Sequence, residues 1–156
     1  MAEPGKRRAC ELAWQEPWQD DRGSLVLGAD STRTSERSLV VHSVEELLTQ
    51  LRKISEKIHR RCGYWAAVSL EGLEEPALYA TAAGDRWHFW YLANGGKVSL
   101  RSCGDEAAGG TTPVIFSEFD EVPDSDLVSN KDGEQVVREW FESKRPSDAI
   151  RWHEFK

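Results

Sequence analysis

The chain has 156 residues, 39% of them hydrophobic, and its seven Trp and five Phe exclude an intrinsically disordered protein. We expect one domain over residues 1–156, located in the cytoplasm, because no apolar stretch approaches the roughly 18 residues that span a bilayer and the basic start resembles no export signal. The net charge of −7 lies entirely in residues 104–156, which hold six basic and thirteen acidic residues, and this favours a basic partner over a nucleic acid.

The first 37 residues are weakly patterned, and we interpret them as an N-terminal extension. Turn-forming residues separate two short apolar groups at 12–14 and 24–27, which are candidate strands. Residues 38–41 predict a strand more clearly, since this run is short, β-branched and followed directly by a helix start.

The clearest predicted element is an amphipathic helix that begins after Ser43. The Ser43 side chain can cap the first turn, and Glu46, three residues later, can return the hydrogen bond, as in a capping box. Apolar residues then recur at intervals of three and four, which predicts one buried stripe: Val44, Leu47, Leu48, Leu51, Ile54 and Ile58. Gly63 is placed to end the helix, soon after Arg60 and Arg61, whose charges suit the C-terminal end of its dipole.

Residues 64–116 alternate with the period of strands. Short runs separated by turn residues predict an antiparallel meander of four strands, at 64–70, 77–82, 86–92 and 97–102. A further strand is expected at 114–116, after a glycine-rich loop at 104–112. The run at 86–92 is apolar on both faces, so it is either a central strand covered on both sides or a strand with one binding face.

The chain ends with a second predicted helix and a short strand. A compact apolar face predicts the helix: Val136, Val137, Trp140 and Phe141. Ser129 or Asn130 can cap its start, Pro146 ends it near Lys144, and alternation at 150–152 predicts the strand. Together the elements predict an α+β fold: an antiparallel β-meander sheet, with an amphipathic helix from the N-terminal half and a C-terminal helix packed on it, ending in a short strand.

The residues that usually carry catalysis or metal binding form no recognisable constellation in the sequence. His59 and Cys62 have a metal-ligand spacing, but no second pair completes the four-coordinate shell that zinc prefers. No nucleophile elbow or phosphate-binding loop occurs, and His88 lies among aromatic residues of a predicted strand, where a structural histidine is more common than a catalytic one. We therefore predict no enzyme, no catalytic residue, no metal site and no cofactor.

An acidic run without basic residues lies between Arg101 and Lys131. It predicts a protein-binding site of five acidic residues, expected to be exposed, and one aromatic anchor: Glu118, Phe119, Asp120, Glu121, Asp124 and Asp126. Two other interpretations of these residues are open. They can form a solvated face without a function, or they can be the catalytic carboxylates of a small enzyme.

Residues 122–152 contain an ordered set of features: an apolar pair, a helix with an aromatic residue, an Arg-Pro turn and a terminal strand with Trp. Their places are held by Leu127 and Val128, Phe141, Arg145 and Pro146, and Trp152. This order resembles the ending of the immunity proteins encoded beside deaminase toxins in bacterial polymorphic toxin systems. The likeness to that family is architectural over 38–116, and residues 1–37 match no part of it.

The resemblance implies an immunity protein, or antitoxin, that binds and neutralises a cognate deaminase-type toxin and so protects the producing bacterium. It implies that the partner is a protein. It also implies that the chain catalyses no reaction and binds neither a nucleic acid nor a membrane. A toxin that acts on nucleic acid needs a basic substrate channel, which the acidic run could occupy as a mimic of phosphate charge. The alternative function is an acidic interaction module or regulatory subunit unrelated to toxins, binding through the aromatic strand at 86–92.

Overall fold

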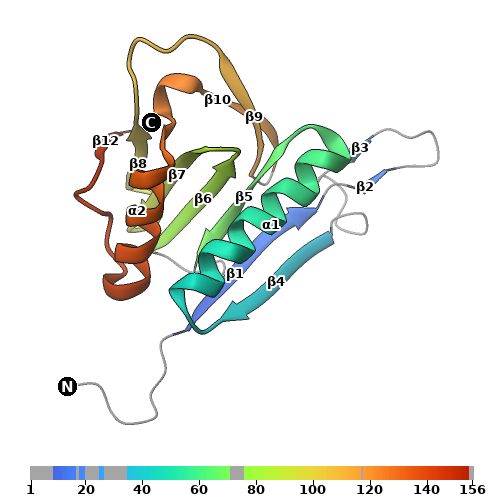
Figure 1. The fold of residues 1–156 in the computed structure, drawn as a ribbon, viewed down its shortest axis with the longest axis horizontal. Helices are drawn as coiled ribbons and strands as arrows, with labels where there is room; N and C mark the ends of the chain where they lie inside the picture. Colours follow the sequence, from blue (N-terminus) through green and yellow to red (C-terminus); the bar gives the residue numbers. More distant parts are fainter. Residues whose placement is uncertain are drawn as a thin grey trace.

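The structure of the protein is a computed structural model that describes residues 9–16, 18–19, 25–26, 35–70, 76–116 and 118–154. It has an α+β fold, in which two helices lie on one face of a large, mostly antiparallel sheet (Figure 1). The fold class predicted from the sequence is therefore confirmed. No helix in these described ranges combines the length and the apolarity needed to cross a membrane.

The centre of the sheet is the meander that the short turns predict. Its strands pair antiparallel in sequence order: β5 (Trp65–Leu70), β6 (Ala77–Ala83), β7 (Arg86–Ala93) and β8 (Val98–Cys103). The last strand, β12 (Arg151–Glu154), pairs with β8 and forms one border of the sheet. The two-residue strand β11 (Val128–Ser129) pairs with the first residues of β7.

The opposite border of the sheet consists of two separate strand pairs that join β5. The first residues of β5 pair in parallel with β9 (Thr111–Ile115), which forms an antiparallel hairpin with β10 (Phe119–Pro123). The last residues of β5 pair with β1 (Cys10–Glu16), whose other edge pairs with β4 (Ser35–Val41). A small separate sheet contains β2 (Trp18–Gln19) and β3 (Leu25–Val26).

Strand β1 corrects the interpretation of residues 1–37 as an extension. Cys10 and Leu12 are fully buried in the main core, and Leu12 pairs with Leu70 of β5. The sequence hides this role because charged and amide residues interrupt the apolar pattern and the pairing partner lies far along the chain. Of the candidate strand at 24–27, Leu25–Val26 forms β3, and its other positions lie outside the described residues.

Helix α1 (Val44–Cys62) has the ends that the sequence predicts. The Ser43 hydroxyl accepts a hydrogen bond from the Glu46 N–H at 3.1 Å, while the Glu46 carboxylate accepts one from the His42 N–H at 3.2 Å. Gly63 ends the helix at a φ of 81°, which strongly favours glycine. The apolar stripe of α1 packs on β5 and β6.

Helix α2 (Asn130–Ser143) packs on β7 and against α1. The Ser129 hydroxyl caps it by accepting a hydrogen bond from the Asp132 N–H at 3.2 Å. Gly133 allows close approach to β7, because a Cβ at this position would overlap the indole of Trp87. The fold therefore fixes α2 directly against the centre of the sheet.

The other face of the sheet is covered by the segment that joins β8 to α2. A second core forms there from Ala67, Val114, Phe116, Val122 and Leu127. The side chains of Trp87 and Phe89 pack in the main core, whereas the fully buried His88 contacts the ring of Phe116 from the second core. The first half of β7 is thus covered on both sides, whereas Trp90, Tyr91 and Leu92 in its second half are partly exposed. Binding through this strand, as in the alternative interaction module, stays a prediction.

Candidate functional site

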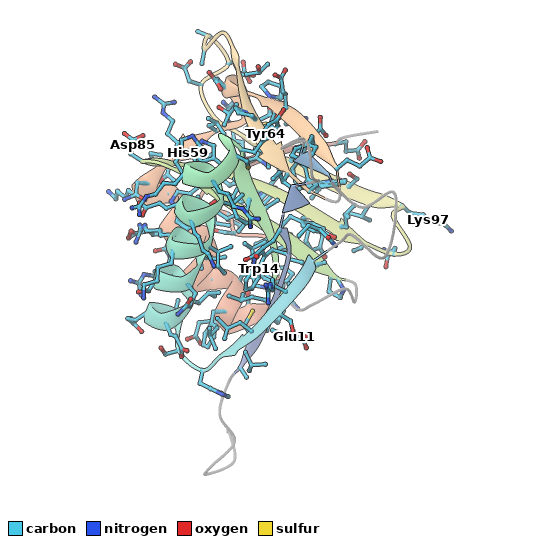
Figure 2. All side chains as sticks on the ribbon, turned by 90° about the vertical axis from the view of Figure 1, so that its right-hand side faces the viewer. Glu11, Trp14, His59, Tyr64, Asp85 and Lys97 are labelled. Atoms are coloured by element: carbon cyan, nitrogen blue, oxygen red, sulfur yellow. The ribbon has the colours of Figure 1, made fainter. Side chains whose placement is uncertain are left out.

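The predicted binding residues lie on β10 and on the 3₁₀ turn η2 (Asp124–Asp126) that follows it. Glu118, Asp120 and Glu121 are exposed, as expected. Phe119 is half-buried, and its ring lies 4.8 Å from the ring of Tyr64. Tyr64 lies just beyond the end of α1 (Figure 2). The structure therefore brings three of the five acidic side chains to the surface. Glu121 lies on the same face of β10 as Phe119, whereas Asp120 lies on the opposite face, on the side of the second core.

Asp126 corrects the expectation that all five carboxylates are exposed, because this residue is only 8% exposed. Its Oδ1 lies 3.1 Å from Nε2 of His153 on β12, and its Oδ2 lies 3.9 Å from Nε2 of His88 on β7. The 3₁₀ turn directs the Asp126 side chain back towards the sheet. There its carboxylate connects η2 to β7 and β12. Asp126 thus holds the hairpin in place and presents no carboxylate to a partner.

Asp124 is half-buried and also has a structural contact. Its carboxylate accepts a hydrogen bond from the Thr112 hydroxyl at 2.6 Å, and its backbone N–H donates to the Gly110 carbonyl at 3.0 Å. These contacts close the open end of the β9–β10 hairpin. We call the exposed carboxylates of Glu118, Asp120 and Glu121 the acidic edge, and treat Asp124 as its support.

Strand β10 forms a border of the sheet, yet its free backbone edge is poorly suited to pair with another strand. In an antiparallel pair, every second residue directs its N–H and C=O groups to the neighbouring strand. Because Asp124 is bonded to Gly110 of the β9 side, the N–H and C=O groups of Phe119, Glu121 and Pro123 point away from β9, to the free edge. Pro123 has no N–H, and the Glu121 N–H donates to the Asp120 carboxylate at 2.7 Å. Proline and charge at an edge prevent strand addition, so this border offers its carboxylates and not its backbone.

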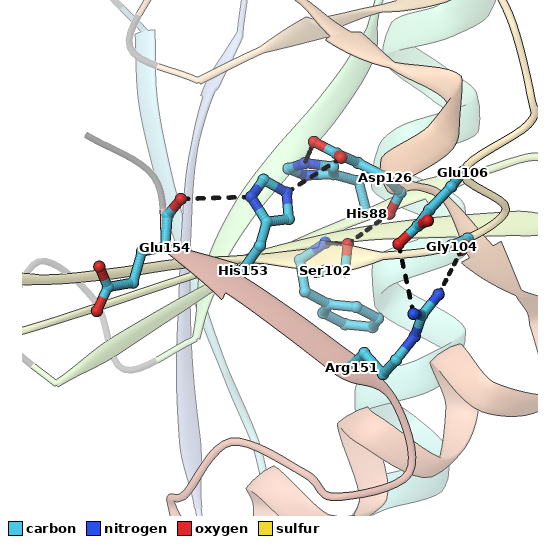
Figure 3. A network of polar contacts seen from close by, with 9 residues as sticks. His88, Ser102, Gly104, Glu106, Asp126, Arg151, His153 and Glu154 are labelled. Atoms are coloured by element: carbon cyan, nitrogen blue, oxygen red, sulfur yellow. Dashed lines mark hydrogen bonds and ion pairs between the residues drawn. The ribbon is translucent and has the colours of Figure 1, made fainter.

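A network of hydrogen bonds fastens the end of the hairpin segment to the sheet (Figure 3). The Ser102 hydroxyl donates to the Asp126 carbonyl at 2.7 Å and accepts from the Phe89 N–H at 3.1 Å. The Gly104 N–H donates to the Ser125 carbonyl at 2.8 Å, and a Cβ on Gly104 would overlap the Leu127 carbonyl. The acidic edge is therefore attached to a rigid support, which lowers the entropy lost when it binds a partner.

Arg151 holds the start of the same segment from β12. Its guanidinium lies 3.4 Å from both the Glu106 carboxylate and the Gly104 carbonyl (Figure 3). Both side chains of the ion pair are largely exposed, so this contact adds little stability. It positions the loop that leads from β8 to β9.

Two buried basic side chains, His88 and Arg101, lie beneath the acidic edge. Burial, with a smaller effect of Arg101 and His153, lowers the pKa of His88 to about 3, so the ring is neutral at physiological pH. Burial also lowers the pKa of Arg101, whereas the carboxylates of Asp120 and Asp126 act in the opposite direction. The Arg101 guanidinium lies 5.0 Å from the ring centre of Trp90, which stabilises it as a cation.

The predicted absence of catalysis and of cofactors remains a prediction. Within the described part of the chain, no three His, Cys, Asp or Glu side chains are grouped so that they could hold a metal ion. His59, which has a metal-ligand spacing from Cys62, stacks on Trp65 with ring centres 3.8 Å apart. The buried His88 and Asp126 form structural contacts with the partly exposed His153, and sequence reasoning did not connect these residues because they come from β7, η2 and β12.

A cleft of about 800 Å³ lies between β12, the end of β8 and the start of α2. Its charged lining includes both signs: Arg86, Lys131 and Arg151 with Asp85, Asp105, Asp132 and Asp148. Burial raises the pKa of the Cys103 thiol at this cleft, which disfavours the reactive thiolate. The mixed lining selects no particular class of ligand.

Neither the scan against protein-family models nor the search of curated proteins matched this chain.

Proposed function

We propose that the chain is an immunity protein that binds and neutralises a cognate deaminase-type toxin of an interbacterial polymorphic toxin system. Two features support the proposal: the likeness of residues 122–152 to the ending of such proteins, and the architectural likeness of residues 38–116 to that family, both drawn from the sequence. The protein acts in the cytoplasm of the producing cell and carries out no reaction of its own.

The observation that carries the proposal is the acidic edge. Glu118, Asp120 and Glu121 are exposed on the two faces of a border hairpin, and no ion pair joins Glu118 or Glu121 to any described residue. No Lys or Arg occurs from residue 102 to residue 130, so no nearby basic residue of the same segment neutralises them. Such a surface attracts a partner with a basic channel and raises its rate of association.

Inhibition follows from occupancy of that channel. A toxin that acts on nucleic acid binds phosphates with basic side chains, and the acidic edge supplies negative charges on a rigid hairpin in their place. The buried contacts of Asp126 and Asp124 keep the hairpin in position before binding. Toxin and substrate then compete for the same surface.

The test measures association with the toxin encoded next to this chain, using Asp120→Lys/Glu121→Lys and a control, Glu11→Lys/Glu45→Lys. Both variants change the net charge equally, and Glu11 and Glu45 are exposed on β1 and at the start of α1, away from β10. At low salt we expect the first variant to associate at least about tenfold more slowly, because electrostatic steering is lost, and the control to change much less.

Two results would contradict the proposal. Equal association rates for the wild-type protein at low and high salt would exclude electrostatic mimicry. If cells that express the wild-type chain were not protected from the neighbouring toxin, the assignment as an immunity protein would be wrong.

A further inference from the structure

Strand β4 forms a border of the sheet, with one edge paired and the other without a partner among the described residues. It pairs continuously with β1, from Val41 opposite Cys10 to Ser35 opposite Glu16, and no other described strand joins it. Figure 1 shows β4 outside β1, on the side away from β5. With seven residues, β4 is longer than the border strands β10 and β12, which have five and four.

The direction of the backbone groups in β4 follows from the strands that connect it to β9. In β9, residues bonded to β10 alternate with residues bonded to β5. Gly110 belongs to the first set, because its carbonyl accepts a hydrogen bond from Asp124, and Ile115 therefore belongs to the second. Strands β5 and β9 run parallel with Ala66 opposite Ile115, so the two neighbours of Ala66 direct their N–H and C=O groups to this edge of β5.

Strand β1 joins the same edge of β5 further along the strand. Ser69 lies an even number of positions from those two neighbours, so it too is bonded across this edge, to Ala13 of β1. The residue before Ala13 is then bonded to β4, where it lies opposite Leu39. The backbone groups of Leu39 consequently point into the sheet, and those of Ser38 and Val40 point to the free edge.

The free edge of β4 lacks the features that prevent border strands from pairing. An unpaired edge is a template for another strand unless proline, charge or a bulge blocks it. Pro123 and the Asp120 carboxylate block β10, whereas residues 38–41 of β4 contain no proline and no charged residue. Val40 is the one large apolar side chain among the described residues that is exposed, at 48%. This edge therefore combines unpaired backbone groups with an exposed apolar side chain.

We propose that β4 binds β4 of a second copy of the chain, antiparallel and around a twofold axis at Leu39. In a twofold interface each copy uses the same surface. Ser38 then lies opposite Val40 of the partner subunit, and Val40 lies opposite Ser38 of the partner subunit. Each of these pairs exchanges two hydrogen bonds, and the two sheets join into one.

The side chains favour this register over its neighbours. Leu39, which packs against the main core, meets Leu39 of the partner subunit, while Val40 lies diagonal to Val40 of the partner subunit on the other face. Arg37 lies opposite Val41 of the partner subunit. An axis at Arg37 would place like charges side by side, and an axis at Ser38 would place Val40 opposite a charged residue. The edge is thus complementary to itself in its hydrogen bonds and in its side chains.

The contacts at this interface are uncharged, which determines how salt affects the dimer. The net charge of −7 on each copy opposes association, and at about 0.15 M salt this repulsion is screened beyond about 8 Å. About 1 M salt screens the repulsion further and leaves backbone hydrogen bonds and apolar contacts in place. We therefore expect the dimer to persist at high salt, whereas association with the toxin proposed above slows.

The dimer does not depend on the proposed function. Strand β4 reaches β5 through β1, whereas the acidic edge reaches it through β9. Dimer and toxin complex therefore do not exclude one another. A chain that dimerises but protects no cell would refute the proposed function alone, and a monomeric chain that protects cells would refute the dimer alone.

Sedimentation equilibrium from about 10 µM to about 1 mM tests the dimer with two substitutions at Val40. Val40→Pro removes an outward N–H, and Val40→Lys adds a charge to the edge; the lysine variant keeps the test valid if the proline variant does not fold. Wild-type protein should dimerise at about 0.15 M and at about 1 M salt, and both variants should associate at least about tenfold more weakly. Ala107→Lys adds the same charge to an exposed residue between β8 and β9 and should dimerise as the wild type does.

Single cysteines test the register, in a protein that carries Cys62→Ser and Cys103→Ser. At the proposed axis the two Leu39 Cα atoms lie about 4.5 Å apart, within the range that a disulfide spans. Leu39→Cys should therefore form a covalent dimer under mild oxidation. Arg37→Cys should not, because it lies about 13 Å from its equivalent in the other copy.

Three results would each overturn the proposal. The first is a wild-type protein that stays monomeric at about 1 mM. The second is a Val40→Lys protein that dimerises as the wild type does. The third is a covalent dimer with Arg37→Cys and none with Leu39→Cys.

Discussion

His88 makes the folded protein sensitive to acid. Its ring is fully buried on β7, and neither ring nitrogen has a hydrogen-bond partner within the described structure. Burial lowers the pKa of the ring from 6.5 to about 3, with smaller contributions from Arg101 and His153. The folded protein therefore keeps His88 neutral in a pH range where the unfolded chain protonates it.

The size and sign of the effect follow from this difference. A base with a lower pKa in the folded state stabilises the fold fully above its unfolded pKa of 6.5, and the contribution is lost as the pH falls from 6.5 towards about 3. Each pH unit in this window costs about 1.4 kcal/mol. At pH 4.5, two units below the unfolded pKa, His88 alone should lower the free energy of unfolding by about 2.7 kcal/mol.

Urea denaturation at pH 8 and pH 4.5 measures this loss in the wild type, in His88→Phe and in the control His42→Phe. Other groups also titrate, so the difference between proteins isolates His88. The His88→Phe protein should lose about 2.7 kcal/mol less than the wild type between the two pH values. His42 is exposed, and its replacement should leave the wild-type loss intact. If His88→Phe lost as much stability as the wild type, the buried neutral state of His88 would be refuted.

Substitutions at three further positions test local contacts of the fold, each by urea denaturation followed by circular dichroism. Gly133→Ala should destabilise the fold by about 1 to 3 kcal/mol although alanine favours helices, because its methyl group overlaps Trp87; a stabilised protein would contradict the close contact. Gly104→Ala should also destabilise, by forcing the end of β8 away from the Leu127 carbonyl, and an unchanged midpoint would contradict this contact. Ser43→Ala should cost about 1 kcal/mol by removing the cap of α1, whereas Ser43→Asp should retain most of it.

The sequence predicts elements well where the signals are local. Ser43 and Gly63 mark the two ends of α1, and Ser129 and Lys144 mark those of α2, because capping depends on residues within one turn. The turns of the meander are similarly local, which is why the order β5, β6, β7, β8 could be predicted. Trp152 on the final strand is partly buried and packs against the main core.

Pairings between distant segments were missed or left open. Strand β1 joins β5 through Leu12 and Leu70, and β9 joins β5 in parallel, although neither pairing leaves a local pattern. The acidic run showed the same limit: composition predicted its charge, but not that part of it forms β10. Which strand lies at the border of the sheet depends on which edges remain unpaired once the other strands have assembled.

The sequence by itself determined that this chain folds into an α+β domain and that its negative charge gathers between Arg101 and Lys131. Only the tertiary structure decided how those carboxylates are used. It exposes Asp120 and Glu121 on a border strand, and it buries Asp126 between His88 and His153. Identical side chains acquire different roles because burial and partners depend on elements that are distant in the chain, and these meet only when the sheet is complete.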